Sequence, residues 1–263
     1  MAGCRRPVGD RGLRRLVVGR GWRRRPVTAA FPPAGFRPPS IRDFYAFEAH
    51  VATARGARGL EMDPGWYEQP VFYFSNPAAV LGHGDVVRFP SSSKEWDYEL
   101  EVAAVIGLEC RDLLADGDAW LDVVAGFTIM NDWSARDLQR VEMRQGLGPA
   151  KGKDFATSLG PVLVRPTPSP AGTMVARVNG VQRSWGELGD LHFTWGQLLA
   201  HASRDTVLVP GDVIGSGTVG TGCLLELRAV AEAEGREPLP WLRSGDVVEL
   251  EVDGIGVLAN TVG

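Results

Sequence analysis

Short apolar runs bounded by glycine, proline and asparagine recur along the chain from residue 41 onward. Asn179-Gly180 between two such runs predicts a tight hairpin. The runs predict strands at 71–74, 98–106, 123–130, 161–164, 172–178, 207–214, 224–230 and 247–252. Helical patterns are few, and they predict a short amphipathic helix over 44–51 with Asp43 as its N-cap and a second helix over 132–144. We therefore expect a mostly β or α+β fold with mixed sheets and a few short helices, rather than a doubly wound α/β fold.

The first 40 residues differ from the rest of the chain. They show no sustained apolar periodicity, are broken by Gly and Pro, and contain ten arginines but only one acid, Asp10. The whole chain has 28 basic and 32 acidic residues. Residues 41–263 therefore contain 18 basic and 31 acidic residues, a net charge of -13. We expect 1–40 to be a disordered extension, with a targeting segment or a basic binding arm as alternatives. Residues 41–263 are expected to form one catalytic domain.

The overall composition excludes several classes of protein. A net charge of -4 and a pI near 5.6 argue against binding to a nucleic-acid backbone. The apolar runs are far shorter than the roughly 20 residues that a membrane span needs. The three cysteines show no pairing pattern, and no G-x-G-x-x-G or P-loop motif is present. We expect a cytoplasmic protein without nucleic-acid or membrane partners.

Two acids interrupt the apolar run at 98–106. Side chains alternate along a strand, so Glu99 and Glu101 point to one face, about 6–7 Å apart along the backbone, with apolar residues on the other face. Two like charges on a hydrophobic strand cost free energy unless they are neutralised, and a hard divalent cation would do this. The alternative is an edge strand whose polar face is solvated.

A second polar group follows the run at 123–130. Asp132 stands at the expected end of this strand, and Arg136 and Gln139 follow four and seven residues later, on one face of the expected helix. An acid, a guanidinium and an amide aimed in one direction could hold a metal and a substrate carboxylate. The alternative is an Asp that caps the helix beside an exposed Arg.

Together these segments resemble the fumarylacetoacetate hydrolase family over about residues 42–262. The E-x-E strand and the N-D-x-S-A-R-D-x-Q motif of the family match 99–101 and 131–139. The loop at 147–155 resembles its lysine-bearing loop. The segments 211–218 and 245–256 resemble its late G-D-x-I, G-T and C-terminal motifs.

The resemblance implies a β-roll fold, a homodimer and a divalent cation, usually Mg²⁺, Mn²⁺ or Ca²⁺. It also implies C–C bond cleavage or related chemistry on β-diketo or 2-oxo acids, as in the catabolism of aromatic compounds. By position, the shared metal ligands would be Glu99, Glu101 and Asp132. Asp97 would support these ligands without binding the metal.

One branch of the family, the fumarylacetoacetases, places D-F-Y five residues before a histidine, as in 43–50 here. This similarity implies that Asp43 is a fourth ligand, Tyr45 a substrate contact and His50 the general base. The branch also implies a substrate contact for Tyr73 and an acid that orients the histidine at Glu226. The acylpyruvase and oxaloacetate decarboxylase branch tends to place a Glu three residues after its histidine, where this chain has Thr53. The chain departs from the fumarylacetoacetases by a shorter turn at 220–222 and by the absence of a substantial N-terminal domain.

These positions suggest a hydrolytic mechanism. His50, held by Glu226, would activate water, and the metal would polarise the attacked carbonyl. The departing enolate would be stabilised by Arg136, Gln139 and Lys153, with Lys151 a competing choice for the lysine, and Thr218 would contact a substrate carboxylate. We therefore predict hydrolysis of a C–C bond in a fumarylacetoacetate- or acylpyruvate-like acid. A decarboxylase, isomerase or hydratase of 2-oxo acids is the alternative within the family.

Overall fold

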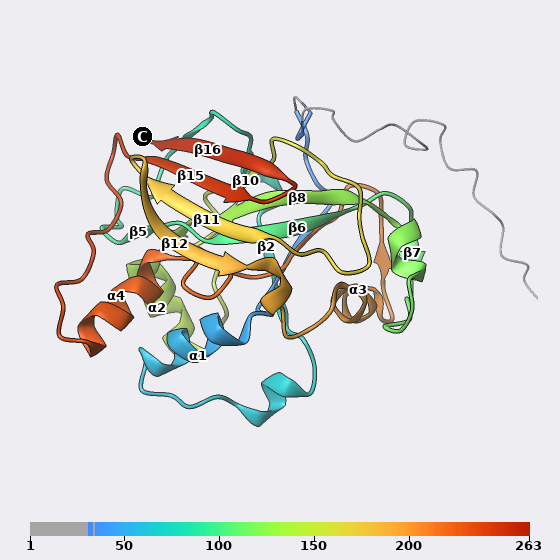
Figure 1. Cartoon of the computed structure of the whole chain (residues 1–263), viewed down its shortest axis with the longest axis horizontal. Helices are drawn as coiled ribbons and strands as arrows, with labels where there is room; N and C mark the ends of the chain where they lie inside the picture. The colour runs from blue at the N-terminus through green and yellow to red at the C-terminus, as the bar shows by residue number, and fades with distance from the viewer. Residues whose placement is uncertain (1–30, 34) are drawn as a thin grey trace, which may run out of the picture.

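The computed structural model describes residues 31–33 and 35–263, and two sheets that pack against each other form its centre (Figure 1). The larger sheet has the strand order β2-β1-β14-β6-β8-β10-β3. Its strands are β1 Ile41–Phe44, β2 Phe72–Ser75, β3 Val80–Leu81, β6 Leu100–Ile106, β8 Val124–Asp132, β10 Thr157–Leu159 and β14 Val213–Gly215. The pairs β1–β14 and β10–β3 are parallel, and the other neighbours are antiparallel.

The smaller sheet has the order β12-β11-β15-β16-β4. Its strands are β4 Val86–Val87, β11 Thr173–Val178, β12 Val181–Glu187, β15 Val247–Val252 and β16 Gly256–Val262. Two short ribbons pair β5 Trp96–Asp97 with β9 Ser134–Ala135 and β7 Cys110–Arg111 with β13 Val207–Leu208. The expected hairpin is confirmed, since Asn179 and Gly180 both take positive φ between β11 and β12.

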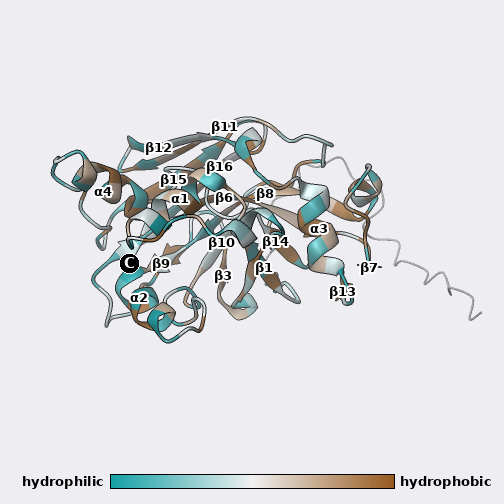
Figure 2. Ribbon diagram, turned by 90° about the horizontal axis from the view of Figure 1, so that it is seen from below, coloured by the Kyte–Doolittle hydropathy of each residue, from teal (hydrophilic) through white to brown (hydrophobic). Residues whose placement is uncertain are grey.

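The described residues form four α-helices outside the sheets. They are α1 Glu48–Gly56, α2 Arg136–Arg144, α3 Trp195–Ser203 and α4 Leu224–Ala233. Short 3-10 helices cover Pro64–Tyr67, Pro77–Ala79, Ala119–Asp122 and Leu188–Asp190. The helices α1, α2 and α4 gather at one end of the sheets and α3 lies apart, both in Figure 1 and from below in Figure 2. The prediction of a mostly β fold with few helices is confirmed.

The strand β6 has both faces buried. Its side chains Val102 and Ala104 pack into the main core between the sheets, together with Leu250 of β15, whereas Ala103 and Val105 pack into a second cluster on the opposite face. Because β6 lies between β14 and β8, the alternative of a solvated edge strand is wrong.

The helix expected to start after Asp43 begins only at Glu48. Asp43 lies in β1, opposite Tyr73 of β2 and Gly215 of β14. All of β1 is buried because it has a strand on either side, so the residues around Asp43 show no period-2 pattern that would have marked a strand.

The segment 224–230 is the start of helix α4, not a strand. Its leucines, Glu226, Arg228 and alanines are strong helix formers, and the first backbone N–H groups donate to a buried carboxylate, Asp97. The residue types of this segment therefore indicate a helix, although the spacing of its apolar positions alone does not.

Other element boundaries also differ from expectation. The strand β8 continues to Asp132, which pairs with Thr157 of β10, so α2 starts only at Arg136 and Asp132 is not its N-cap. The segment 161–164 forms no strand and contributes only isolated bridge positions at Val162 and Val164. Pro161 at its start has no N–H for a ladder. The expected strand 207–214 is divided into β13 and β14.

The described part of the first 40 residues packs on the body. Phe31 is buried in the second cluster, and its N–H donates to the Pro161 carbonyl oxygen at 2.8 Å. The disorder expected for 1–40 does not extend to the packed Phe31, and residues 1–30 and 34 lie outside the described residues. Within the described part of the chain, no helix is long and apolar enough to cross a membrane.

Candidate active site

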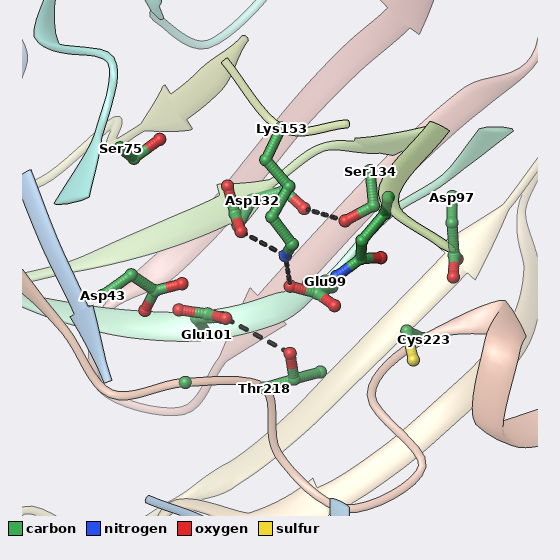
Figure 3. A network of polar contacts seen from close by, with 12 residues as sticks. Asp43, Ser75, Asp97, Glu99, Glu101, Asp132, Ser134, Lys153, Thr218 and Cys223 are labelled. Carbon is green, nitrogen blue, oxygen red and sulfur yellow. Dashed lines mark hydrogen bonds and ion pairs between the residues drawn. The ribbon is translucent and has the colours of Figure 1, made fainter. Parts of the chain in front are cut away.

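Three carboxylates from different parts of the chain meet at one end of the larger sheet. One oxygen each of Asp43, Glu99 and Glu101 lies within 4.8 Å of the others, and all three side chains are buried. Asp43 comes from β1, Glu101 comes from β6, and Glu99 directly precedes β6. Figure 3 shows the Asp43 and Glu101 carboxylates pointing toward each other. The sequence prediction that these acids share a site agrees with this geometry.

The close approach of Asp43 depends on a glycine in the neighbouring strand. Gly215 is opposite Asp43 in the β1–β14 pair, and a Cβ on Gly215 would lie 2.3 Å from Asp43 Oδ1. Any larger residue would therefore displace the carboxylate from its position over β14.

Lys153 and Tyr73 connect Asp132 to this cluster. Lys153 Nζ donates to Glu99 Oε2 and to Asp132 Oδ2, as Figure 3 shows, and its side chain is buried. The Tyr73 hydroxyl lies against Asp132 Oδ2 and 2.9 Å from Asp43 Oδ2. Lys151, the competing choice, is exposed and pairs with Asp154 on the surface. The lysine that enters the site is Lys153.

The carboxylates differ in their pKa values. Burial and the neighbouring acids raise the pKa of Glu101 well above its ordinary range and raise that of Asp132 to about 7, although Lys153 opposes the shift at Asp132. Burial also raises the pKa of Asp43. For Glu99 the effect of burial is outweighed by Lys153 and Arg136, so its pKa is lowered. The cluster therefore holds more negative charge than its cations neutralise.

The residues present fit a divalent cation. Asp43 Oδ1, Glu101 Oε2 and Asp132 Oδ1 are buried and have no hydrogen-bond partner among the described residues. A buried carboxylate oxygen without a partner is costly, and Mg²⁺, Mn²⁺ and Ca²⁺ bind such oxygens. This donor set contains only oxygens, which is the chemistry of a hard-cation site.

His50 and Glu226 form a buried pair beside this cluster. His50 Nδ1 of α1 lies 2.8 Å from Glu226 Oε2 of α4, although the ring N–H does not point along this contact. Glu226 also accepts from the Thr221 backbone N–H at 3.0 Å and from the Cys223 thiol at 3.3 Å. The Tyr45 ring packs edge-on against His50, and burial raises the pKa of Tyr45 to about 12. The structure thus brings together the two residues that the sequence predicted as a pair.

Arg136 links the carboxylate cluster to helix α4. Its guanidinium contacts Glu99 Oε1 and Asp97 Oδ2, both at 2.8 Å, and donates to Gln139 Oε1 at 3.0 Å. Asp97 in turn accepts from the backbone N–H groups of Leu224 and Leu225 at 2.7 and 3.0 Å. Asp97 therefore serves as the cap of α4, a role that its place beside the E-x-E strand did not indicate.

A cavity of about 360 Å³ connects these groups. All of the predicted site residues line it except Asp132 and Glu226, which lie behind the lining side chains. Thr218 lines it as well and donates to Glu101 Oε1 at 3.2 Å (Figure 3). Its other walls include apolar side chains, among them Val71, Phe72, Met143 and Leu225.

Sequence reasoning missed several residues of the site. Arg140 and Met143 line the cavity from α2, one and two helical turns along from Arg136, a spacing that could have found them. The sequence left open whether Arg55 or Arg58 is a substrate arginine, and of the two Arg58 lines the cavity. Cys223 precedes Glu226 by three residues, which would have placed it near the pair had the helix been predicted.

The family profile for the fumarylacetoacetate (FAA) hydrolase C-terminal domain matches residues 40–263. The chain belongs to the fumarylacetoacetate hydrolase family. It is 36% identical over 201 residues to the oxaloacetate tautomerase YisK of Bacillus subtilis, covering 74% of this chain and 62% of that protein. It is 34% identical over 201 residues to the human mitochondrial oxaloacetate tautomerase FAHD2A, covering 74% of this chain and 59% of that protein. The chain thus spans about three-fifths of the length of these relatives.

Solved structures of the family share this fold. The 5-carboxymethyl-2-hydroxymuconate delta-isomerase of Mycobacterium smegmatis superimposes with a TM-score of 0.66 at 28% identity, over 86% of this chain and 77% of that one. The fumarylpyruvate hydrolase of Pseudomonas aeruginosa, in complex with Mn²⁺ and pyruvate, gives a TM-score of 0.70 at 21% identity, over 89% and 94%. The fold expected from the sequence is therefore confirmed.

Proposed function

We propose that this chain is a divalent-metal-dependent enzyme that hydrolyses a C–C bond in a β-diketo acid. The observation that carries the proposal is the His50–Glu226 pair at 2.8 Å, with His50 opening onto the same cavity as the carboxylate cluster. A proton-transfer pair beside a cation site is what water attack on a carbonyl requires.

The cation would be held by Asp43, Glu99, Glu101 and Asp132, whose oxygens include three that are buried without a hydrogen-bond partner in the described part of the chain. When bound, it would act as a Lewis acid toward the oxygens of a 2-oxo acid. Lys153, Tyr73 and Thr218 keep these carboxylates in place through hydrogen bonds.

The proton transfers would be carried out by His50 and Glu226. His50 would take a proton from water, Glu226 would stabilise the imidazolium, and the hydroxide would add to the distal carbonyl carbon. The C–C bond then breaks, its electron pair passes to the leaving enolate, and His50 returns the proton to the enolate carbon. Arg136, Lys153 and the amide N–H₂ of Gln139 would stabilise the developing negative oxygen.

The cavity favours a substrate with an acyl tail. A volume of about 360 Å³ exceeds what a four-carbon diacid needs, and the apolar walls at Phe72, Met143 and Leu225 would bury hydrocarbon. Tyr45, which lines the same cavity beside His50, would contact this part of the substrate.

A second candidate is keto–enol tautomerisation of a 2-oxo acid such as oxaloacetate. It is favoured by the names of the relatives at 34–36% identity. The same His50 would then move a proton between carbon and oxygen, and no water would be consumed. Decarboxylation and hydration of 2-oxo acids are also reactions of this family, but no contact in the site favours either of them.

One assay separates the candidates. The purified chain with Mg²⁺ or Mn²⁺ is given acylpyruvates, fumarylacetoacetate and enol-oxaloacetate, and products are resolved by chromatography while the enol absorbance is followed. Hydrolysis yields two carbonyl or carboxylate fragments, whereas tautomerisation changes the absorbance with no new mass. Turnover of oxaloacetate alone, without cleavage of any diketo acid, would reject the hydrolase in favour of the tautomerase.

We also propose that the chain forms a homodimer, as the resemblance to the family implied. Light scattering coupled to size-exclusion chromatography tests this, with twice the chain mass of 28.4 kDa as the expected result.

A further inference from the structure

A second group of metal-ligand side chains lies next to the carboxylate cluster. One ligand atom each of His50, Cys223 and Glu226 lies within 4.8 Å of the others, and all three residues are buried. The closest pairs are His50 Nδ1 with Glu226 Oε2 at 2.8 Å and Cys223 Sγ with Glu226 Oε2 at 3.3 Å. This set combines nitrogen, sulfur and oxygen, in contrast to the all-oxygen set of the first site.

We propose that His50, Cys223 and Glu226 form an inhibitory site for a thiophilic divalent cation, with Zn²⁺ as the best match. Zn²⁺ binds imidazole nitrogen and carboxylate oxygen at about 2.0–2.2 Å and thiolate sulfur at about 2.3 Å, usually with four ligands. The separations in this group need only small side-chain movements to reach such distances. Three protein ligands leave one position for water.

An independent observation points to a ligand at this place. His50 is nine-tenths buried, and its Nδ1 has no aligned hydrogen bond within the described part of the chain, despite the nearby Glu226. A nitrogen that is close to a carboxylate but not bonded to it in line can turn toward a cation between them. His50 also lines the cavity, which provides the path for entry.

The charges of the group suit a divalent cation. Cys223 would lose its proton to solvent on binding, so a thiolate, a carboxylate and a neutral imidazole together balance the two positive charges. Burial and the acids Glu226 and Asp97 raise the pKa of Cys223 well above its ordinary value, so the free thiol is not a nucleophile. Mg²⁺ prefers oxygen ligands, so the two sites separate hard from soft cations.

Occupation of this site would stop catalysis. With a cation on Nδ1, the single proton of the neutral His50 ring must lie on Nε2, which then has no lone pair to accept a proton from water. This inhibitory part rests on the proposed function, whereas the binding part does not. The site would make the enzyme sensitive to Zn²⁺ at concentrations where Mg²⁺ has no such effect.

The binding test uses the full chain saturated with Mg²⁺, in which Cys4 and Cys110 are replaced by Ser so that Cys223 is the single thiol. Addition of Co²⁺ should produce a thiolate-to-cobalt charge-transfer band with one equivalent bound, and Zn²⁺ should displace it. This measurement needs no change at Cys223. The absence of a band, or a band that does not saturate at one equivalent, would overturn the proposal.

The second measurement compares Cys223→Ser with the Cys110→Ser control. Zn²⁺ inhibition should weaken at least about tenfold in Cys223→Ser and stay unchanged in Cys110→Ser. Loss of a metal ligand should lower Zn²⁺ affinity at least as much as loss of a residue that hydrogen-bonds to a ligand, which is typically tenfold or more. Equal Zn²⁺ inhibition in both variants would also overturn the proposed Zn²⁺ site. A charge-transfer band without any inhibition by Zn²⁺ would support the metal site and count against His50 as the catalytic base.

Discussion

Asp97 binds Arg136 at 2.8 Å, and both side chains are buried. The same carboxylate caps helix α4, which carries Glu226, while Arg136 contacts Glu99 in the carboxylate cluster. One ion pair therefore connects the candidate cation site to the candidate proton-transfer pair. A displacement of the cation site would therefore shift helix α4 and Glu226 through this contact, and the reverse also holds.

Replacement of Asp97 tests the connection. Asp97→Asn preserves shape but removes one of the two buried counter-charges of Arg136, so the free energy of unfolding should fall by on the order of 3 kcal/mol. Chemical denaturation measures this. As a control, Asp112→Asn removes an exposed charge paired with Arg111 and should leave the free energy of unfolding nearly unchanged. Equal losses in the two variants would show that the buried pair has no special role.

Removal of His50 should separate chemistry from metal binding. His50→Ala should lower kcat for the diketo acid about 10²- to 10⁴-fold, because the proton acceptor is lost. Affinity for Mg²⁺, measured by calorimetry, should stay within about twofold, since the oxygens of the carboxylate cluster are unchanged. The exposed His83 supplies the matched control, and His83→Ala should leave kcat unaltered. Full turnover in His50→Ala would reject the assignment of the base.

Metal removal tests the carboxylate cluster. EDTA should abolish turnover and added Mg²⁺ should restore it in the unmodified protein. In Glu101→Ala added Mg²⁺ should not restore turnover. This variant lacks Glu101 Oε2, one of the three buried carboxylate oxygens that have no hydrogen-bond partner among the described residues. If calorimetry still finds Mg²⁺ binding of unchanged affinity in that variant, Glu101 is not a ligand.

The stability gained from Mg²⁺ should increase with pH. Folding raises the pKa of Asp132 from an ordinary 3.8 to about 7, so its protonated form stabilises the metal-free fold at low pH and this contribution is lost as pH rises through 7. A cation neutralises the same carboxylate. The shift in Tm caused by Mg²⁺ should therefore grow between about pH 5 and pH 8. A shift that is constant over this range would contradict the excess of negative charge in the carboxylate cluster.

Much of the site could be predicted from the sequence because its residues occur in contiguous motifs. The alternation around Glu99 and Glu101 correctly placed both acids on one face, and the apolar run before Asp132 correctly placed that acid at a strand end. Local patterns sufficed here, because strand alternation depends on neighbours within a few residues.

Local patterns failed where packing between distant segments decided the conformation. Asp43 has the sequence environment of a helix cap, but pairing with β2 and β14 makes it part of a strand. The segment at Glu226 reads as a strand by its apolar positions and becomes a helix whose first N–H groups find Asp97.

The sequence by itself determined a mostly β chain with an acid-rich site of the fumarylacetoacetate hydrolase family. Only the tertiary structure decided that Cys223 joins His50 and Glu226, and that Asp97 connects helix α4 to Arg136. The physical reason is that these contacts join segments far apart in the chain. Their formation depends on how the sheets and helices pack, and not on the preferences of neighbouring residues.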